Sequence, residues 1–265
     1  MIFYLSATGN TRWAAEHLAS ATGEQLISIS EAVNGSCDFS VNKDERIGFV
    51  FPVHGWRPPR LVREFIRKMN IHHLDNNFCY ALCTAGDDIG QTMEILNCDL
   101  RQQHLKADSI YSLIMPESYV GLPFMDIDKP EKEIAKILKA NELLNEYTRE
   151  IVQRKRGICK TYKGHWPRIN SWLLGTLFNR FLITDRPFFV DAGKCIRCGK
   201  CADSCITGNM TGGKGELPQW KHQGDCCTCF ACYHHCPVRA IEYGSRTKNK
   251  GQYYFNKNKN NNLNK

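Results

Sequence analysis

Two runs of four cysteines have the clearest chemistry in this sequence. The chain has 265 residues and 14 cysteines, and both runs follow the spacing C-x2-C-x2-C-x3-C. The first run is Cys195, Cys198, Cys201 and Cys205; the second, which a proline follows, is Cys226, Cys229, Cys232 and Cys236. This spacing is typical of bacterial [4Fe–4S] ligation, in which each cluster takes three cysteines of one run and the last cysteine of the other. It predicts one cluster on Cys195, Cys198, Cys201 and Cys236 and another on Cys205, Cys226, Cys229 and Cys232.

Zinc and disulfide bonds are the alternatives for such a segment. Structural zinc usually takes two separated pairs of ligands rather than two runs of four. Met1 leads into a short apolar run without a basic segment or a cleavage site, so we expect a cytoplasmic protein, where disulfides are rare. We expect the remaining cysteines to be packing residues: Cys37, Cys79, Cys83, Cys98, Cys159 and Cys227. We expect surface positions for His222, His234 and His235.

A hydroxyl-rich loop follows the first apolar run of the chain. Residues 6–11 read Ser-Ala-Thr-Gly-Asn-Thr, and a helical pattern begins at once. Hydroxyls and backbone N–H groups at a helix N-terminus favour a bound phosphate. The loop lacks the glycine spacing of dinucleotide-binding and P-loop sequences. We expect phosphate binding by Ser6, Thr8, Gly9, Asn10 and Thr11; the alternative is that the hydroxyls only cap the helix.

Segments after later apolar runs should meet this loop, because ligands of open parallel sheets bind at the carboxyl ends of the strands. We expect a bound ring to be flanked by Pro52, Val53, His54, Gly55, Trp56, Thr84, Ala85, Gly86 and Asp87, with Tyr119 as a second aromatic. Trp56 would stack on a flat ring, and Gly55 and Gly86 would let the backbone approach its edge. The alternatives are an ordinary loop aromatic at Trp56 and a helix start at Asp87.

The elements that would position these residues alternate along the first part of the chain. Apolar runs at residues 2–5, 25–29, 46–51, 78–83 and 109–115 lack strict polar alternation, which is typical of parallel strands buried on both faces. Apolar residues at helical spacing occur around residues 14–19, 61–69, 93–100 and 130–156. The order predicts an α/β fold with a doubly wound, five-stranded parallel sheet.

A connector at residues 158–188 and a tail at residues 246–265 follow different patterns. The apolar stretch 169–183 is too short to span a membrane, and we expect it to pack against the neighbouring domains rather than on a membrane surface. Residues 145–186 have nine Lys+Arg against three Asp+Glu, whereas residues 1–144 have 14 against 19. The tail has six Lys+Arg and no acidic residue, and we expect disorder from residue 248 onward. This distribution does not indicate a nucleic-acid groove.

The loop and the cysteine runs together resemble a known family. Residues 6–11 match the flavodoxin pattern Ser/Thr-x-Thr-Gly-x-Thr, and the doubled run resembles a two-cluster bacterial ferredoxin. In this order they are similar to the flavodoxin–ferredoxin fusions called EFR-type ferredoxins. The resemblance implies a flavodoxin-like, FMN-binding domain at residues 1–157 and a small α+β ferredoxin domain with two [4Fe–4S] clusters at residues 189–245. It also implies electron transfer between FMN and the clusters.

Two function classes remain open. An electron carrier would serve redox partner proteins and have no substrate of its own, whereas a reductase would use FMN and the clusters on a small molecule. The sequence has no recognisable acid–base pair and no nucleophile with an adjacent base, which favours the carrier. A redox sensor is a third class without positive support. Neither the donor nor the acceptor of electrons follows from the sequence.

Overall fold

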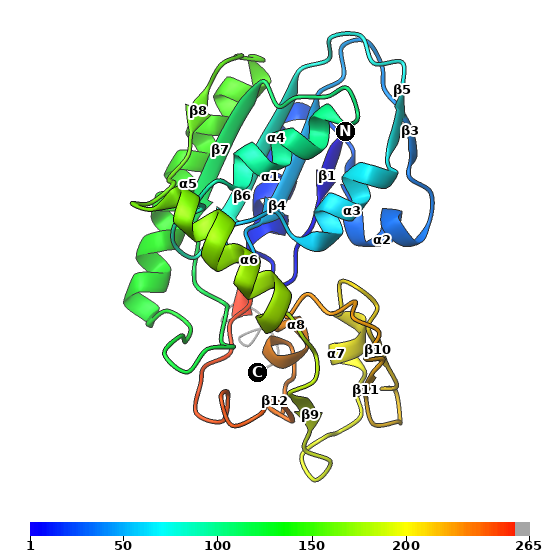
Figure 1. Ribbon diagram of the computed structural model, residues 1–265, viewed down its shortest axis with the longest axis vertical. Coiled ribbons are helices and arrows are strands. Elements are labelled where there is room, and N and C mark those ends of the chain that lie inside the picture. The colour runs from blue at the N-terminus through cyan, green and yellow to red at the C-terminus, as the bar shows by residue number, and fades with distance from the viewer. Residues whose placement is uncertain (258–265) are drawn as a thin grey trace.

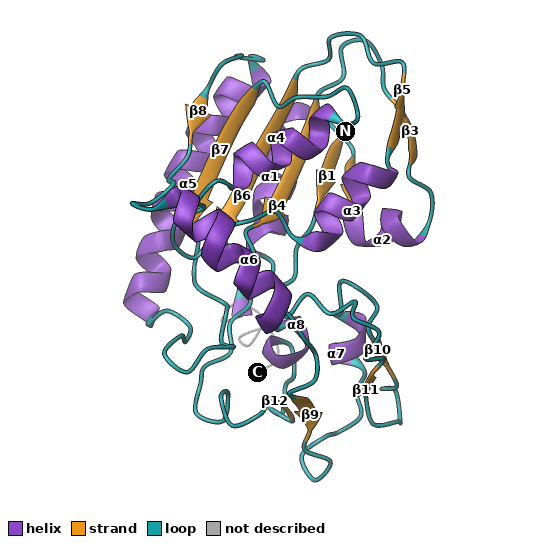
Figure 2. Ribbon diagram, in the orientation of Figure 1, coloured by secondary structure: helices purple, strands orange, loops and turns teal. Residues whose placement is uncertain are grey.

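A parallel sheet of six strands forms the centre of the larger part of the molecule (Figures 1 and 2). The computed structural model describes residues 1–257. The strand order is β2-β1-β4-β6-β7-β8, and all neighbours are parallel. The bounds are β1 (Ile2–Tyr4), β2 (Leu26–Ser28), β4 (Ile47–Pro52), β6 (Cys79–Ala85), β7 (Ser109–Ile114) and β8 (Cys159–Lys160). Five strands were predicted; β8 is an addition at the edge, whose two residues carry no detectable pattern.

Helices cover both faces of the sheet. These are α1 (Asn10–Thr22), α2 (Ile29–Asn34), α3 (Arg60–Lys68), α4 (Thr92–Arg101) and α5 (Pro130–Val152). One face packs against α1 and α5 through side chains such as Leu18 and Leu144, and the other against α2, α3 and α4 through Phe65 and Leu96. Because both faces are covered, the strands consist of nearly continuous apolar residues. A short parallel pair, β3 (Asp38–Ser40) and β5 (Asn70–His72), lies beside this sheet.

The connection pattern places a ligand site at the ends of β1 and β4. After β1 the chain passes through α1 to β2, which pairs with one side of β1. The other side of β1 pairs with β4. The direction of winding therefore reverses between β1 and β4, and the loops after these strands diverge. In open α/β sheets such a point is where ligands bind.

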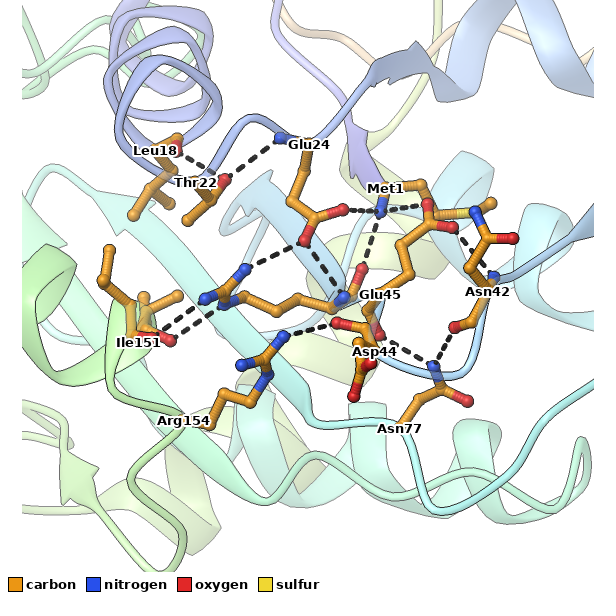
Figure 3. Close-up of polar contacts among 12 residues, drawn as sticks. Met1, Leu18, Thr22, Glu24, Asn42, Asp44, Glu45, Asn77, Ile151 and Arg154 are labelled. Atoms are coloured by element: carbon orange, nitrogen blue, oxygen red, sulfur yellow. Dashed lines mark hydrogen bonds and ion pairs between the residues drawn. The ribbon is translucent and has the colours of Figure 1, made fainter.

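At the end of the sheet opposite the carboxyl ends of β1 and β4, charged side chains and backbone groups join neighbouring segments (Figure 3). The amine of Met1 donates to carboxylates of Glu24 and Glu45, each at 2.7 Å. Arg46 donates to Glu24 and to the carbonyl oxygens of Ile151 and Val152 at the C-terminal end of α5. A guanidinium is favourable there because the last carbonyls of a helix lack intrahelical partners.

The cysteine-rich part forms a smaller unit below the sheet in Figure 1. Its elements are β9 (Phe188–Val190), α7 (Lys200–Asp203), β10 (Met210–Thr211), β11 (Gln219–Trp220), α8 (Ala231–His234) and β12 (Ile241–Tyr243). The antiparallel pairs are β9 with β12 and β10 with β11. Phe188, Phe230 and Tyr243 pack against one another with ring centroids 4.6–5.3 Å apart and form the aromatic part of its core.

The connector contains one helical rod, which runs diagonally across the front of the molecule in Figure 1. It consists of η1 (Ile169–Leu174), α6 (Gly175–Leu177) and η2 (Phe178–Leu182). The expected packing against the rest of the chain is found for one face, on which Ser171 and Gly175 are buried; the other face is exposed. Among residues 1–257, no helix is long and apolar enough to cross a membrane.

The expectation of a disordered tail is wrong for residues 248–257. Lys250 and Tyr253 are buried, and the Lys250 ammonium donates to the carbonyl oxygens of Val120 and Leu122. Phe255 packs against Trp13 with ring centroids 5.3 Å apart. The prediction failed because isolated aromatics among Asn and Lys residues leave no periodic signal. Residues 258–265 lie outside the described part of the chain.

Candidate functional site

A cavity lies at the carboxyl ends of the strands, between the sheet and the cysteine-rich unit. Its wall consists of the loops after β1, β4, β6 and β7, together with Cys227, Thr228 and Cys229. Fourteen of the fifteen residues predicted to bind the nucleotide line it: Ser6, Thr8, Asn10, Thr11, Pro52, Val53, His54, Gly55, Trp56, Thr84, Ala85, Gly86, Asp87 and Tyr119. The fifteenth, Gly9, lies in the loop behind the wall and precedes α1 directly.

The loop after β1 has the geometry of an anion site. Gly9 has a φ of 94°, a left-handed conformation that glycine adopts without strain, and no side chain caps α1. The Ser6 hydroxyl accepts a hydrogen bond from the Gly9 N–H at 3.2 Å. The backbone N–H groups of residues 10–12 donate to no atom of the described chain. Free N–H groups at the start of a 13-residue helix fit a phosphate, so the capping alternative does not account for these hydroxyls.

Two side chains of this loop form hydrogen bonds with neighbouring segments of the chain. The Thr11 hydroxyl is 2.7 Å from that of Thr84, at the end of β6. The Asn10 amide donates to the Pro116 carbonyl oxygen at 3.1 Å, and its oxygen accepts a hydrogen bond from the Tyr253 hydroxyl at 2.5 Å. Asn10 and Thr11 therefore tie the phosphate loop to β6, to the loop after β7 and to the C-terminal segment.

The loop after β4 turns back through two residues with positive φ. His54 and Arg57 exchange backbone hydrogen bonds, and Gly55 and Trp56 between them have φ of 55° and 57°. For a large side chain this conformation is strained, and such strain is common where a residue is held against a ligand. Trp56 lines the cavity, as a ring-stacking role requires.

Side chains distant in the sequence lie close to the two glycines, Gly55 and Gly86. A Cβ on Gly55 would lie 2.6 Å from the ring of Phe178 in the connector helix, and one on Gly86 would lie 2.1 Å from a Glu117 carboxylate oxygen. Both glycines are therefore closely approached by protein side chains, and both also line the cavity. The sequence could not reveal this, because Phe178 and Glu117 are distant in the chain.

Glu117 is the main cavity residue that the sequence analysis missed. Burial raises the pKa of its carboxyl, although it accepts hydrogen bonds from the N–H groups of Ser118 and Tyr119. Burial also lowers the pKa of the nearby His54 to about 4, so this imidazole is neutral at pH 7. The only sequence signal for Glu117 was its place in the loop after the fifth predicted strand.

The first set of predicted iron ligands meets in one place. Cys195, Cys198, Cys201 and Cys236 line a common pocket, so the last cysteine of the second run joins three of the first. The sulfur of Cys195 accepts a hydrogen bond from the N–H of Arg197 at 3.4 Å, and that of Cys236 from the N–H of Ala240 at 3.2 Å. Backbone N–H groups aimed at ligand sulfurs are a feature of iron–sulfur sites.

The second set is also brought together. The pKa of Cys232 is raised well above its ordinary value by burial and then by the neighbouring thiols of Cys229, Cys226 and Cys205. The N–H of Thr228 donates to the sulfur of Cys226 at 3.3 Å, as Arg197 does in the first set. Arg197 and Thr228 occupy matching places in the two runs, and both have positive φ, 54° and 47°. The two runs thus repeat the same local backbone.

These sets do not have the geometry of a mononuclear site. Among residues 1–257, no three His, Cys, Asp or Glu side chains are placed to bind a single metal ion.

Two protein-family models match the chain, one in each of its two parts. The family model described as a flavodoxin domain matches residues 1–108, and the one described as a 4Fe-4S dicluster domain matches residues 188–237. The chain is a flavodoxin–ferredoxin fusion. Its domains support a role in electron transfer and indicate FMN and iron–sulfur clusters as cofactors. A search of curated proteins found no match.

Two histidines of the fusion link its parts, contrary to the expected surface positions. His234 is buried; one ring nitrogen is 2.6 Å from the Ser118 carbonyl oxygen, and the other accepts a hydrogen bond from the Tyr253 N–H. His235 is partly buried, with a ring nitrogen 3.3 Å from the Ala7 carbonyl oxygen in the phosphate loop. Both lie between the predicted ligands Cys232 and Cys236, so the cysteine run contacts the flavodoxin domain directly.

The cysteines outside the predicted ligand sets differ in burial. Cys79, Cys83 and Cys227 are buried as expected, Cys37 is half-buried, and Cys98 and Cys159 are exposed, contrary to expectation. Burial raises the pKa of the Cys227 thiol to about 12. A thiol with this pKa stays protonated at pH 7, which agrees with a packing residue beside the ligand Cys226.

Proposed function

We propose that this fusion carries electrons between one FMN and two [4Fe–4S] clusters and exchanges them with redox partner proteins. The observation that supports this proposal most directly is that Cys229, a predicted cluster ligand, lines the same cavity as the phosphate loop. FMN exchanges one or two electrons and each cluster one, so the pair would join two-electron and one-electron chemistry.

The residues have separate roles in this proposal. The N–H groups of residues 10–12 and the hydroxyls of Ser6 and Thr8 would hold the FMN phosphate. Trp56 and Tyr119 would enclose the ring from the loops after β4 and β7. The set Cys195, Cys198, Cys201 and Cys236 would hold one cluster, and the set Cys205, Cys226, Cys229 and Cys232 the other.

The first cysteine set offers a surface for partners. Cys198 is exposed, and the adjacent Ile196 is 61% exposed. Neither residue lines the cavity between the domains. This exposure supports electron exchange with another protein at the first set, because an exposed cluster edge shortens the path to a partner.

Anaerobic purification followed by FMN and iron determination tests the proposal. We expect about one FMN and about eight irons per chain. Cys229→Ser should lose about half of the iron and, with FMN supplied in excess, slow electron transfer from photoreduced flavin to iron at least about tenfold, because this ligand lines the cavity. Cys98→Ser, at an exposed cysteine outside both sets, is the matched control. Eight irons without flavin, or equal transfer rates in both variants, would contradict the proposal.

A reductase acting on a small molecule is the second candidate, and Glu117 favours it. A buried carboxyl with a raised pKa in the cavity is a group that can hold a proton at a higher pH than an ordinary Glu. The two candidates differ in an assay with chemically reduced protein and small oxidants. A reductase would turn over a substrate at a rate that Glu117→Gln reduces, whereas a carrier would react with proteins at a rate that this substitution leaves unchanged.

A further inference from the structure

The connector helix exposes a continuous apolar stripe. Ile169, Leu173, Leu177 and Phe181 recur every four residues and are 48%, 57%, 47% and 63% exposed. Two tryptophans of the same segment are also exposed: Trp166 is 66% exposed, and Trp172 is 58% exposed although its indole N–H donates to the Gln91 side-chain oxygen and Arg57 lies over its ring. Isolated exposed apolar residues are ordinary, but a contiguous stripe of this kind marks an interaction surface.

The opposite face of the helix fixes the direction in which the stripe points. The buried Ser171 hydroxyl donates to the Trp56 carbonyl oxygen at 2.9 Å and accepts from the Gln91 N–H at 2.7 Å. Arg57 donates to the Ser171 carbonyl oxygen and to the Thr176 hydroxyl. The helix is therefore held against the loops after β4 and β6, and the stripe cannot turn inward without breaking these contacts.

Within the segment that contains the stripe, the charged side chains have one sign. Residues 164–184 contain no Asp or Glu, and the next acidic residue, Asp185, is buried and paired with Asn209 and His222. Arg168, Arg180 and Arg186 form no ion pair within residues 1–257. The guanidinium of Arg180 lies over the ring of Phe181, at 5.4 Å. Whatever covers the stripe must therefore be apolar at its centre and negative around it.

We infer that this helix docks the protein on an anionic lipid surface, lying in the plane of the interface. Tryptophan, leucine and phenylalanine on one face with arginine at its border are the composition of interfacial helices. The rod of residues 169–182 is mostly π-helical, and even at the α-helical rise of 1.5 Å per residue it would be only about 21 Å long, shorter than the roughly 30 Å of a bilayer core, so it can lie on a membrane but not span it. The arginines would face the lipid phosphates.

A second copy of the chain is a poorer occupant of the same face. In an antiparallel two-fold pairing of the rod, the end with Arg168 would meet the end with Arg180 of the other copy. Like charges brought together in this way disfavour association, and no acidic residue of the stripe could offset them.

Sedimentation of the full chain with vesicles tests the inference. We expect binding to vesicles of phosphatidylglycerol and phosphatidylcholine, weaker binding to phosphatidylcholine alone, and loss with rising salt. The double variant Leu173→Ser, Leu177→Ser should bind at least about tenfold more weakly, since two apolar side chains no longer enter the interface. Arg180→Gln should weaken binding to the anionic vesicles and leave binding to neutral ones unchanged.

The matched control is Leu138→Ser. Leu138 is 62% exposed on α5, among charged residues of both signs, and we expect no change in vesicle binding. Unchanged FMN and iron content in each variant would show that the fold is retained. Absent vesicle binding, or equal binding by the double variant and the control, would overturn the inference. So would a dimer or an acidic protein complex that forms through Leu173 and Leu177 without any vesicle binding.

Discussion

The buried environment of Glu117 allows a specific prediction about how the stability of the protein depends on pH. Burial raises the pKa of its carboxyl, so the folded protein retains this proton at pH values where the unfolded chain has lost it. The unfolding free energy should therefore fall as pH rises from the ordinary Glu pKa to the raised one, by about 1.4 kcal/mol for each pH unit between the two. Below the ordinary pKa, this penalty is absent.

Glu117→Gln removes the titrating proton and preserves the shape of the side chain. We expect the thermal midpoint of the variant, compared with the natural chain, to rise steadily from pH 4.5 towards the raised pKa when both are flavin-depleted. Glu131→Gln, at an exposed carboxyl in the first turn of α5, should show no such trend. A constant difference between the Glu117 variant and the natural chain at all pH values would refute the buried-carboxyl interpretation.

At the scale of elements, the C-terminal segment supports the phosphate loop. Its backbone N–H at Phe255 donates to the Thr8 carbonyl oxygen at 2.8 Å, and the Tyr253 hydroxyl donates to Asn10. A Cβ on Gly9 would lie 2.9 Å from the Cβ of Phe255, so the segment presses directly on the loop. Without it, the amides of the loop would be less firmly oriented toward the cavity.

Tyr253→Phe tests this support with the loss of a single hydroxyl. The buried Asn10 oxygen would lose its partner, at a cost of about 1–3 kcal/mol, and we expect FMN to bind at least about fivefold more weakly. Tyr254→Phe is the control, because that tyrosine stacks on His235 and its hydroxyl has no hydrogen-bond partner within residues 1–257. Equal FMN dissociation constants for the two variants, measured by fluorescence titration, would show that the hydroxyl has no role.

Sequence patterns predicted the buried strands and the cysteine runs well. They did not predict the contacts between individual residues that are distant in the chain. Each buried strand is a run of apolar residues, and the two cysteine runs have a fixed spacing, so both are visible locally. The apolar stripe of the connector was also visible, but periodicity does not show which face of a helix is covered. Tyr253, Phe178 and Glu117 act through neighbours far away in the chain, and no local pattern encodes such contacts.

At the scale of the whole molecule, the cysteine-rich unit completes the cavity in which we propose that FMN binds. Cys227, Thr228 and Cys229 form part of its wall, and Arg60 of α3 donates to the Gly224 carbonyl oxygen at 2.8 Å. We expect the order of this segment to depend on bound iron, because its cysteines are spaced for a cluster. Iron removal should therefore reach the flavin site.

We expect iron chelation under anaerobic, reducing conditions to weaken FMN binding about tenfold or more, since one wall of the cavity loses its fixed conformation. The phosphate loop and the strand ends would remain, because they belong to the sheet and its own two cores. FMN affinity should recover when iron and sulfide are restored. If FMN instead binds equally well before and after chelation, the sheet alone forms the flavin site, and the shared wall does not couple the two cofactors.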